Sequence, residues 1–484
     1  MKMLPFTAGF MPGRMLTKDN LYELSSKTMI CIAISTIVLG AWAQRDQIEG
    51  VLERLTALQW GIAYLAVART LFVINVAALF WRFYLVLFYK PARTCTDSEL
   101  PTCTVIIPAY NEGRHVADTI DSVAAGDYPT DKLQIIAVDD GSADDTWEWI
   151  QQAAARHPHL VTPLRLKRNS GKRKALYEGF IRSQADIVVT IDSDSIIEKN
   201  TLRNLVSPFV TQSNVGAVAG NVRVLNRHQG LIPKMLDVSF AFSFDFIRAS
   251  QSQVDSVLCT PGALSAYRRD LVMKVLRAWM NQRFLGQKSN IGEDRAMTNL
   301  ILKQGFAVKF QSNAVVFTQV PVRYKGLCKM FLRWARSNIR ETIEMARFVF
   351  KPFRTNRLGA QLNFLHSVIN LFGATFMIFG TLGCILWEPQ VFLAQILLGA
   401  ELMAIIPGAF YAFKYRSSNA LWAFAYSLFW LAGLAWISPY ALLTVGNNKW
   451  LTRTLPAAGT VAVASAPKQP SRTGSIISHD LLPV

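Results

Sequence analysis

The sequence predicts an α/β domain with a parallel β-sheet, embedded between apolar helices of a membrane region. Of the 484 residues, 51% are apolar and only 17% are charged, a balance that favours an integral membrane protein with a globular part. Apolar runs of membrane length lie on both sides of one polar block. Inside that block, short apolar strands alternate with amphipathic segments, which predicts βαβ units with ligands at the carboxyl ends of the strands.

The N-terminal part, residues 1–100, is expected to form a membrane region with two spans. The apolar run 28–43 is just long enough for a thin bilayer, and the polar stretch before it is too long for an ordinary signal peptide. We therefore expect a retained anchor. In the second run, 58–89, we expect an interfacial lead-in followed by one span, with Arg82 reaching the cytoplasmic surface.

The polar block, residues 101–320, is expected to form the α/β domain. Its apolar runs are short and bounded by turn residues, which is typical of buried strands, and the segments between them have helical periodicity. We expect strands at residues 104–109, 133–138, 161–166 and 187–191, and helices near residues 144–155 and 172–183.

The remainder of the chain returns to the membrane. Residues 321–360 form a basic amphipathic stretch expected at the membrane interface, and residues 361–453 a second membrane region. Gly433 and Pro439 interrupt the last apolar segment, so we expect it to follow an interfacial or re-entrant path. Residues 454–484, rich in Ala, Ser, Pro and Gly, are expected to be a disordered tail. The apolar segments of the second membrane region lie near residues 362–387, 391–413 and 421–445.

The charge and the cysteines exclude several classes of protein. The net charge is +18, but Lys and Arg crowd around the apolar segments, so positive-inside topology and anionic substrates explain the charge without a nucleic-acid partner. The six cysteines are scattered and form no Cys-x-x-Cys pair. This spacing predicts neither a zinc site nor a disulfide framework and fits a reducing cytoplasmic face.

Two turns after the predicted strands have residues suited to a nucleotide. Tyr110 and Glu112 follow the first strand, and Asp140, followed by Gly141, ends the second. A carboxylate at a strand end can accept hydrogen bonds from a base or a ribose, and a glycine lets the ligand approach the backbone. Alone, an Asp-Asp-Gly-Ser sequence is more often an ordinary turn.

Basic residues begin the helix after the third strand. Lys172 and Arg173 follow Gly171 at the predicted helix N-terminus, where cations oppose the helix dipole and where phosphate groups commonly bind. A solvated basic patch explains them equally well. The spacing of a Walker A loop is absent.

The segment Asp192-Ser193-Asp194 ends the fourth strand. Two aspartates two residues apart in an extended chain point to the same side, an arrangement that is costly unless a cation lies between them. A solvated loop is the competing interpretation. We favour a metal site, and Mg²⁺ or Mn²⁺ suits carboxylate and phosphate ligands.

Two later motifs complete the candidate site. Glu293 and Asp294 begin a helix, where an acidic pair is ordinary capping, but Asp294 could act as a general base if it faces the metal site. Arg333 and Trp334 lie in the basic amphipathic stretch. A Trp there usually marks a membrane-interface helix, and it could also stack on a sugar ring.

Together these residues resemble the processive family 2 glycosyltransferases, which include hyaluronan, chitin and rhizobial chitooligosaccharide synthases and, more distantly, cellulose synthase. The resemblance covers residues 102–453 and rests on the ordered set of motifs rather than on any one of them. It implies a Rossmann-like GT-A domain that is cytoplasmic and embedded between transmembrane and interfacial helices.

The resemblance also implies a role for each residue. Asp294 would be the catalytic base, and Asp192 and Asp194 the metal ligands for Mg²⁺ or Mn²⁺. Cys259, Gly262, Arg333 and Trp334 would bind the acceptor. The implied nucleotide contacts are Tyr110, Glu112, Asp140, Lys172, Arg173, and the gating-loop residues Trp450 and Arg453.

One position departs from the family pattern. Met330 stands where the Gln-x-x-Arg-Trp motif has glutamine, so a thioether replaces a side-chain amide. This leaves the handling of donor or acceptor at that position open and weakens any transfer of product identity. The base, the metal ligands and the aromatic residue are unaffected.

The resemblance implies an inverting, multi-pass enzyme of the plasma or inner membrane. It would polymerise a β-linked polysaccharide from UDP-sugars, of hyaluronan or chitin type, using UDP-N-acetylglucosamine with or without UDP-glucuronate, and extrude it across the bilayer. Its partners would be the UDP-sugar donor, the nascent polysaccharide and the lipid bilayer. A non-processive transferase acting on a lipid carrier leaves the Arg-Trp and gating motifs without a role. A transporter with a nucleotide-binding domain would have repeated spans with polar midplane residues, and this signature is largely missing from the sequence.

Overall fold

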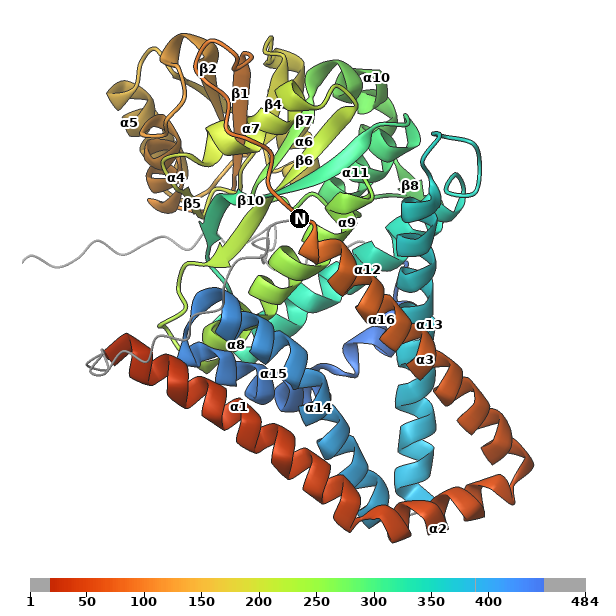
Figure 1. Cartoon of the computed structure of the whole chain (residues 1–484). Coiled ribbons are helices and arrows are strands. Elements are labelled where there is room, and N and C mark those ends of the chain that lie inside the picture. Colours follow the sequence, from red (N-terminus) through yellow and green to blue (C-terminus); the bar gives the residue numbers. More distant parts are fainter. Residues whose placement is uncertain (1–17, 388, 448–484) are drawn as a thin grey trace, which may run out of the picture.

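The computed structural model describes residues 18–387 and 389–447. Figure 1 shows a domain with a central sheet at one end of the molecule and long helices that extend away from it on one side. Trp450, Arg453 and the predicted tail at 454–484 lie outside the described residues.

The central sheet has eight strands in the order β3-β2-β1-β4-β7-β6-β10-β5. Strand β1 pairs in parallel with β2 and β4, β2 with β3, and β6 with β10. The strands are β1 (Cys103–Ala109), β2 (Leu133–Asp139), β3 (Val161–Arg165), β4 (Ile187–Thr190), β5 (Ser195–Ile197), β6 (Val215–Val224), β7 (Ser265–Arg268) and β10 (Ala307–Thr318); β8 (Arg283–Phe284) and β9 (Gln287–Lys288) form a separate hairpin.

The expectation of a parallel sheet is wrong for two strands. Strand β7 pairs antiparallel with both β4 and β6, and β5 pairs antiparallel with β10. The first half of the domain alternates strand and helix, which enforces parallel crossovers. The chain reaches β7 after a long run of helices, so no such crossover constrains its direction.

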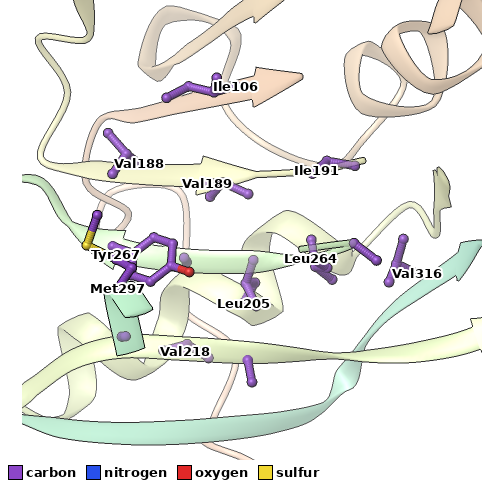
Figure 2. Packing of buried hydrophobic residues seen from close by; sticks show 14 of the residues in the cluster. Ile106, Val188, Val189, Ile191, Leu205, Val218, Leu264, Tyr267, Met297 and Val316 are labelled. Atoms are coloured by element: carbon purple, nitrogen blue, oxygen red, sulfur yellow. The ribbon is translucent and has the colours of Figure 1, made fainter. Parts of the chain in front are cut away.

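The core explains why these segments form strands. All seven residues of β1 are buried, and Ile106, Val188 and Val189 of the neighbouring strands pack together in Figure 2. Helices cover the sheet, so buried strands are continuously apolar rather than alternating. The main covering helices are α4 (His115–Ala124), α5 (Thr146–Arg156), α6 (Lys172–Arg182), α7 (Thr201–Thr211), α10 (Arg269–Met280) and α11 (Glu293–Lys303).

Two helical segments lie between the sheet and the long helices in Figure 1. The first runs through α8 (Leu231–Phe242), the π-helical segment η2 (Ser243–Arg248) and α9 (Ala249–Gln253). The second is α12 (Tyr324–Ala346), which lies in the basic amphipathic stretch that the sequence places at the membrane interface.

Three described helices are long and apolar enough to cross a membrane: Gln59–Leu87, Leu358–Trp387 and Ile396–Tyr415. A bent pair, Ser418–Leu434 and Ile437–Leu443, makes a fourth if it is one broken span. The long helices are α1 (Lys18–Ala43), α2 (Arg45–Thr56), α3 (Gln59–Leu87), α13 (Leu358–Trp387) and α14 (Pro389–Tyr415), followed by α15 (Trp422–Phe429), η4 (Trp430–Leu434) and α16 (Ile437–Leu443).

The N-terminal region differs from the sequence expectation in three ways. Its first apolar segment, Ile30–Ala43, is shorter than a span, because the first turns of α1 are polar. The second apolar segment, α3, is one continuous helix without a separate interfacial lead-in. Arg82 does not reach the aqueous surface: it is buried and donates from Nη1 to Ser250 Oγ at 3.0 Å. A polar partner in the packed helices satisfies the guanidinium instead of water.

The last apolar segment is bent, which agrees with the expectation that it does not form a straight span. The helices Ser418–Leu434 and Ile437–Leu443 are bent by 40° at a break between Leu434 and Ile437. The bend lies between the predicted interruptions at Gly433 and Pro439.

Candidate active site

The candidate site lies where β4, α6, α11 and the loop before β7 meet. Because β1, β2 and β4 are parallel, the residues that follow them lie at the same edge of the sheet. The sequence-predicted carboxylates after β2 and β4 therefore share this edge with the start of α6.

Lys172 is the charged centre of the site. Its Nζ donates to Asp192 Oδ1 and lies 3.3 Å from Glu293 Oε1. Burial lowers the pKa of Lys172, but the two carboxylates raise it more, so the net shift is upward. Lys172 also lines a small cavity with Gly262 and Asp294. The structure thus brings a fixed positive charge from the nucleotide motif to the predicted metal and base residues.

Asp294 is the second residue of α11 and is half-buried beside this charge. Gly292, at φ 74°, begins the helix, and a Cβ there would overlap the Ser337 side chain. Burial and the neighbouring Glu293 raise the pKa of Asp294, while Lys172 opposes them. A carboxylate with a raised pKa binds a proton more readily, which is the property a general base needs.

The loop before β7 passes directly over these groups. Cys259 Sγ lies 3.8 Å from Asp294 Oδ2. A Cβ at Gly262 would lie 2.6 Å from Lys172 Nζ and 3.5 Å from both Asp192 carboxylate oxygens. Burial and the Asp294 charge raise the pKa of the Cys259 thiol to about 12, so the thiol is neutral at physiological pH and is no nucleophile.

The residues of the predicted metal site are close to each other. Burial and the negative charge of Asp192 raise the pKa of Asp194 to about 6, and Thr318 Oγ1 lies 3.3 Å from Asp194 Oδ1. Among the described residues, no group of three or more His, Cys, Asp or Glu side chains could hold a metal ion. Two hard carboxylate donors fit a cation that takes its remaining ligands from phosphate and water.

The turns after β1 and β2 are joined by hydrogen bonds. The Asn111 amide donates to Ser142 Oγ at 3.0 Å, and the Glu112 amide donates to Thr146 Oγ1 at 2.8 Å. Tyr110 is half-buried beside this junction. The structure therefore brings Tyr110, Glu112 and the Asp140 turn together, and their contact with a nucleotide stays a prediction.

Asp140 holds the loop that leads into α6. Its Oδ1 and Oδ2 accept hydrogen bonds from the backbone amides of Ser170 and Gly171, at 2.8 and 2.7 Å. Burial raises the pKa of Asp140 to about 6, although these two hydrogen bonds oppose the shift. Asp140 thus positions Lys172 through the backbone, and its predicted contact with uridine stays a prediction.

Arg173 lies beside the cavity but does not line it. Its Nη1 donates to the Trp279 carbonyl at 2.6 Å and to Gln282 Oε1 at 3.0 Å, and its guanidinium lies over the Trp279 ring at 5.1 Å. It supports the end of α10, and its predicted nucleotide contact stays a prediction.

Helix α12 brings the Arg-Trp motif to the same region. The charge of Arg333 lowers the pKa values of Glu293 and Asp294, so it acts on the two carboxyl groups of the site. Trp334 is 39% exposed and packs against Phe331 and Phe240. Met330 is buried in the hydrophobic core, so packing rather than a polar contact occupies the position that departs from the family pattern.

Arg295, expected from its place after Asp294 to help hold the geometry of the base, is fixed by Asn338 and by Thr342 Oγ1 at 3.0 Å. Two other residues of the site are missing from the sequence prediction. Glu293 binds Lys172, and only its place beside Asp294 in the sequence points to it. Arg248 donates to the Cys259 carbonyl, and no motif in the sequence identifies it.

Comparison with known proteins establishes the family. A sequence profile described as "Glycosyltransferase like family 2" matches residues 101–337. An N-acetylglucosaminyltransferase of Mesorhizobium japonicum is 31% identical over 380 residues, which cover 78% of this chain and 87% of that protein. The chain belongs to glycosyltransferase family 2. A hyaluronan synthase of Streptococcus pyogenes is 32% identical over 358 residues, covering 72% of this family 2 glycosyltransferase and 82% of the synthase.

A solved structure shares the fold of this family 2 glycosyltransferase. The mannosyltransferase PcManGT from Pyrobaculum calidifontis, solved with GDP-Man and Mn²⁺, superposes with a TM-score of 0.56 at 21% identity. The match covers 75% of this chain and 97% of that protein. The fold is therefore the GT-A fold, flanked by apolar helices.

Proposed function

We propose that this enzyme polymerises a β-linked polysaccharide containing N-acetylglucosamine from UDP-sugars, and that it passes the product across the membrane. The observation that carries the proposal is the grouping of Lys172, Asp192 and Asp294 beneath the Cys259 loop. The names of the relatives, an N-acetylglucosaminyltransferase and a hyaluronan synthase, support the sugar. The apolar helices support the membrane location.

In the proposed mechanism, Asp294 takes the proton from the acceptor hydroxyl. The hydroxyl oxygen then attacks the anomeric carbon of the donor, the bond to UDP breaks, and the configuration inverts. The ammonium of Lys172 stabilises the negative charge of the departing diphosphate. A Mg²⁺ or Mn²⁺ ion held by Asp192 and Asp194 would supply further charge neutralisation there.

The Cys259 loop and Trp334 would hold the acceptor chain. The neutral thiol and the small Gly262 leave the loop backbone next to the site, and Trp334 offers an aromatic face to a sugar ring. The UDP-sugar donor would enter from the cytoplasm, where sugar nucleotides are made. We therefore assign the enzyme to the plasma or inner membrane with the GT-A domain cytoplasmic.

The direct test supplies purified protein in lipid nanodiscs with UDP-N-acetylglucosamine, UDP-glucuronate or both, plus Mg²⁺ or Mn²⁺. The expected product is a polymer that linkage-specific hydrolases degrade. Asp294→Asn should lower the rate about 10²- to 10⁴-fold, the usual contribution of a general base. A product of one sugar on a lipid, or near-normal turnover by folded Asp294→Asn, would contradict the proposal.

A further inference from the structure

The π-helical segment η2, Ser243–Arg248, separates α8 from α9 and has partners on two sides. A π-helical turn is rare because its hydrogen bonds are strained, and it persists mostly at functional positions. Here it places Asp245 against the end of membrane helix α14 and Arg248 against the loop of the candidate site. The two contacts lie on one short rigid element.

Asp245 is a buried carboxylate that joins three elements. Its oxygens accept hydrogen bonds from Asn221 Nδ2 at 3.0 Å and Arg223 Nη2 at 3.1 Å, both on β6. From the end of α14, Lys414 Nζ lies at 2.7 Å and the Tyr415 hydroxyl donates to Oδ2. A buried carboxylate is stable only when such partners stay in place, so Asp245 ties the sheet to the end of α14.

Arg248 makes the second connection of the segment. Its Nε donates to the Cys259 carbonyl at 3.3 Å, and its Nη1 donates to Ser243 Oγ at 3.0 Å within the segment itself. Its guanidinium lies 3.8 Å from the centre of the Phe244 ring, which restricts its orientation. The loop that Arg248 holds is the one whose Cys259 thiol lies 3.8 Å from Asp294.

We propose that Asp245 and Arg248 are positioning residues for the acceptor, which act by fixing the Cys259 loop relative to membrane helix α14. The inference rests on the proposed function, because it takes the Cys259 loop as the place where the acceptor meets the base. A displacement of the end of α14 would shift η2 through Asp245 and the Cys259 carbonyl through Arg248. The charge of Arg248 also acts on Asp294, and Arg248→Lys keeps that charge, so the effect of positioning alone should appear in the acceptor KM.

The chain offers a matched control one helical turn away. Tyr411 OH donates to Asp237 Oδ2 at 2.6 Å and joins α14 to α8 ahead of the π-helical segment. Tyr411→Phe and Tyr415→Phe each remove one hydroxyl that binds a buried aspartate from the same face of α14. Of these two tyrosines, Tyr415 binds the π-helical segment that contains Arg248, and Tyr411 binds α8 instead.

The experiment measures transfer to β-linked N-acetylglucosamine oligosaccharides by the full chain in nanodiscs. Arg248→Met and Lys414→Met are each expected to raise the acceptor KM about tenfold and to shorten the polymer, with the donor KM unchanged. In the double variant, the change in acceptor KM should be smaller than the two single changes combined, because both substitutions act through one network.

Tyr415→Phe should shift the acceptor KM in the same direction, and Tyr411→Phe should not. Arg248→Lys, which keeps the charge but loses the planar fork, should retain the raised acceptor KM.

Three results would overturn the inference: additive effects in the double variant, an acceptor KM restored by Arg248→Lys, or equal effects of the two tyrosine variants. These results all require an active wild-type enzyme. Failure of the wild-type protein to transfer sugar from any UDP-sugar would instead overturn the proposed function.

Discussion

Gly262 lies directly against the charged groups of the candidate site. Its α-carbon faces Lys172 and Asp192 so closely that even a methyl group would displace the ammonium. Because Lys172 is held between two carboxylates, moving it away leaves their charges unpaired. The position therefore needs glycine for space rather than for backbone conformation.

We predict that Gly262→Ala lowers the affinity for UDP about tenfold or more while the protein still folds. The methyl group pushes Lys172 away from Asp192, and one lost charge-assisted contact is worth about 1.5–3 kcal/mol. Calorimetric titration of UDP measures the effect. Ala263→Gly, at the neighbouring buried position of the same loop, controls for general loosening of the loop. Unchanged UDP affinity in Gly262→Ala would show that Lys172 does not contact the nucleotide.

Asp194 makes the site sensitive to pH. Its pKa is raised to about 6, so the carboxyl is protonated below that pH and has lost the charge that attracts a cation. We predict that the apparent affinity for Mn²⁺ is constant above pH 7 and falls about tenfold per pH unit well below pH 6. Activity titrated with Mn²⁺ from pH 5 to 7.5 measures this.

Asp140 needs a separate control because its pKa is also raised to about 6. UDP binding without metal, followed over the same pH range, isolates its contribution. A flat profile of Mn²⁺ affinity from pH 5 to 7.5 would exclude Asp194 as a ligand of the ion.

At the scale of elements, α12 connects the site to the end of α16. Arg340 is fully buried on α12, and its Nε and Nη2 donate to the Val445 carbonyl at 2.9 and 2.7 Å. Nη2 also donates to the Asn447 carbonyl at 3.0 Å, and Arg336 Nη2 donates to Thr444 Oγ1 at 2.8 Å. Arg340 thus binds two carbonyls of the segment that follows α16, and Arg336 binds the Thr444 hydroxyl just after the helix.

We predict that Arg340→Met releases the segment after α16 and costs about 1–3 kcal/mol of local stability, because the Val445 and Asn447 carbonyls lose a charged donor. Hydrogen exchange of amides in α16, followed by mass spectrometry, should show faster exchange there. Arg347→Met on the same helix is the control, since its pair with Glu344 is largely exposed and contributes little. Equal exchange in the Arg340 and Arg347 variants would contradict the role of Arg340.

The elements also show what sequence reasoning can reach. The first four strands follow from buried apolar runs between helical segments, and the convergence of Lys172, Asp192 and Asp294 follows from their places at strand and helix ends. The direction of β7 and the burial of Arg82 do not follow, because each depends on partners distant in sequence. The role of Arg248 does not follow either, because nothing in the sequence pairs its side chain with the Cys259 carbonyl.

At the scale of the whole molecule, polar contacts join the GT-A domain to the long helices α3 and α14. Arg82 of α3 binds Ser250, and Tyr89, just after α3, donates to the Phe310 carbonyl at 2.9 Å. Asp245 binds the end of α14. The ends of α3 and α14 next to the GT-A domain therefore lie on the same side of the molecule.

These contacts predict the path of the last apolar segment. If α13 and α14 both span the membrane, the chain returns at Tyr415 to the side of the GT-A domain, where Asp245 binds it. The end of α16 binds Arg340 on α12, which carries the Arg-Trp motif of the site. Both ends of the bent pair Ser418–Leu434 and Ile437–Leu443 thus lie on one side, so the pair must be re-entrant rather than a broken span.

We therefore predict that a cysteine at Ser417 and a cysteine at Asn447 are both labelled from the cytoplasmic side of sealed inside-out vesicles by a membrane-impermeant maleimide. Neither should react in intact cells, because neither position faces the exterior. A cysteine at Leu386, near the far end of α13, should show the opposite pattern and serves as the control. The background is a chain without cysteines, since Cys31 is exposed and Cys259 and Cys328 are partly exposed. Labelling of the Asn447 cysteine in intact cells would mean that the bent pair crosses the membrane, and that the contact of α16 with Arg340 does not form in the bilayer.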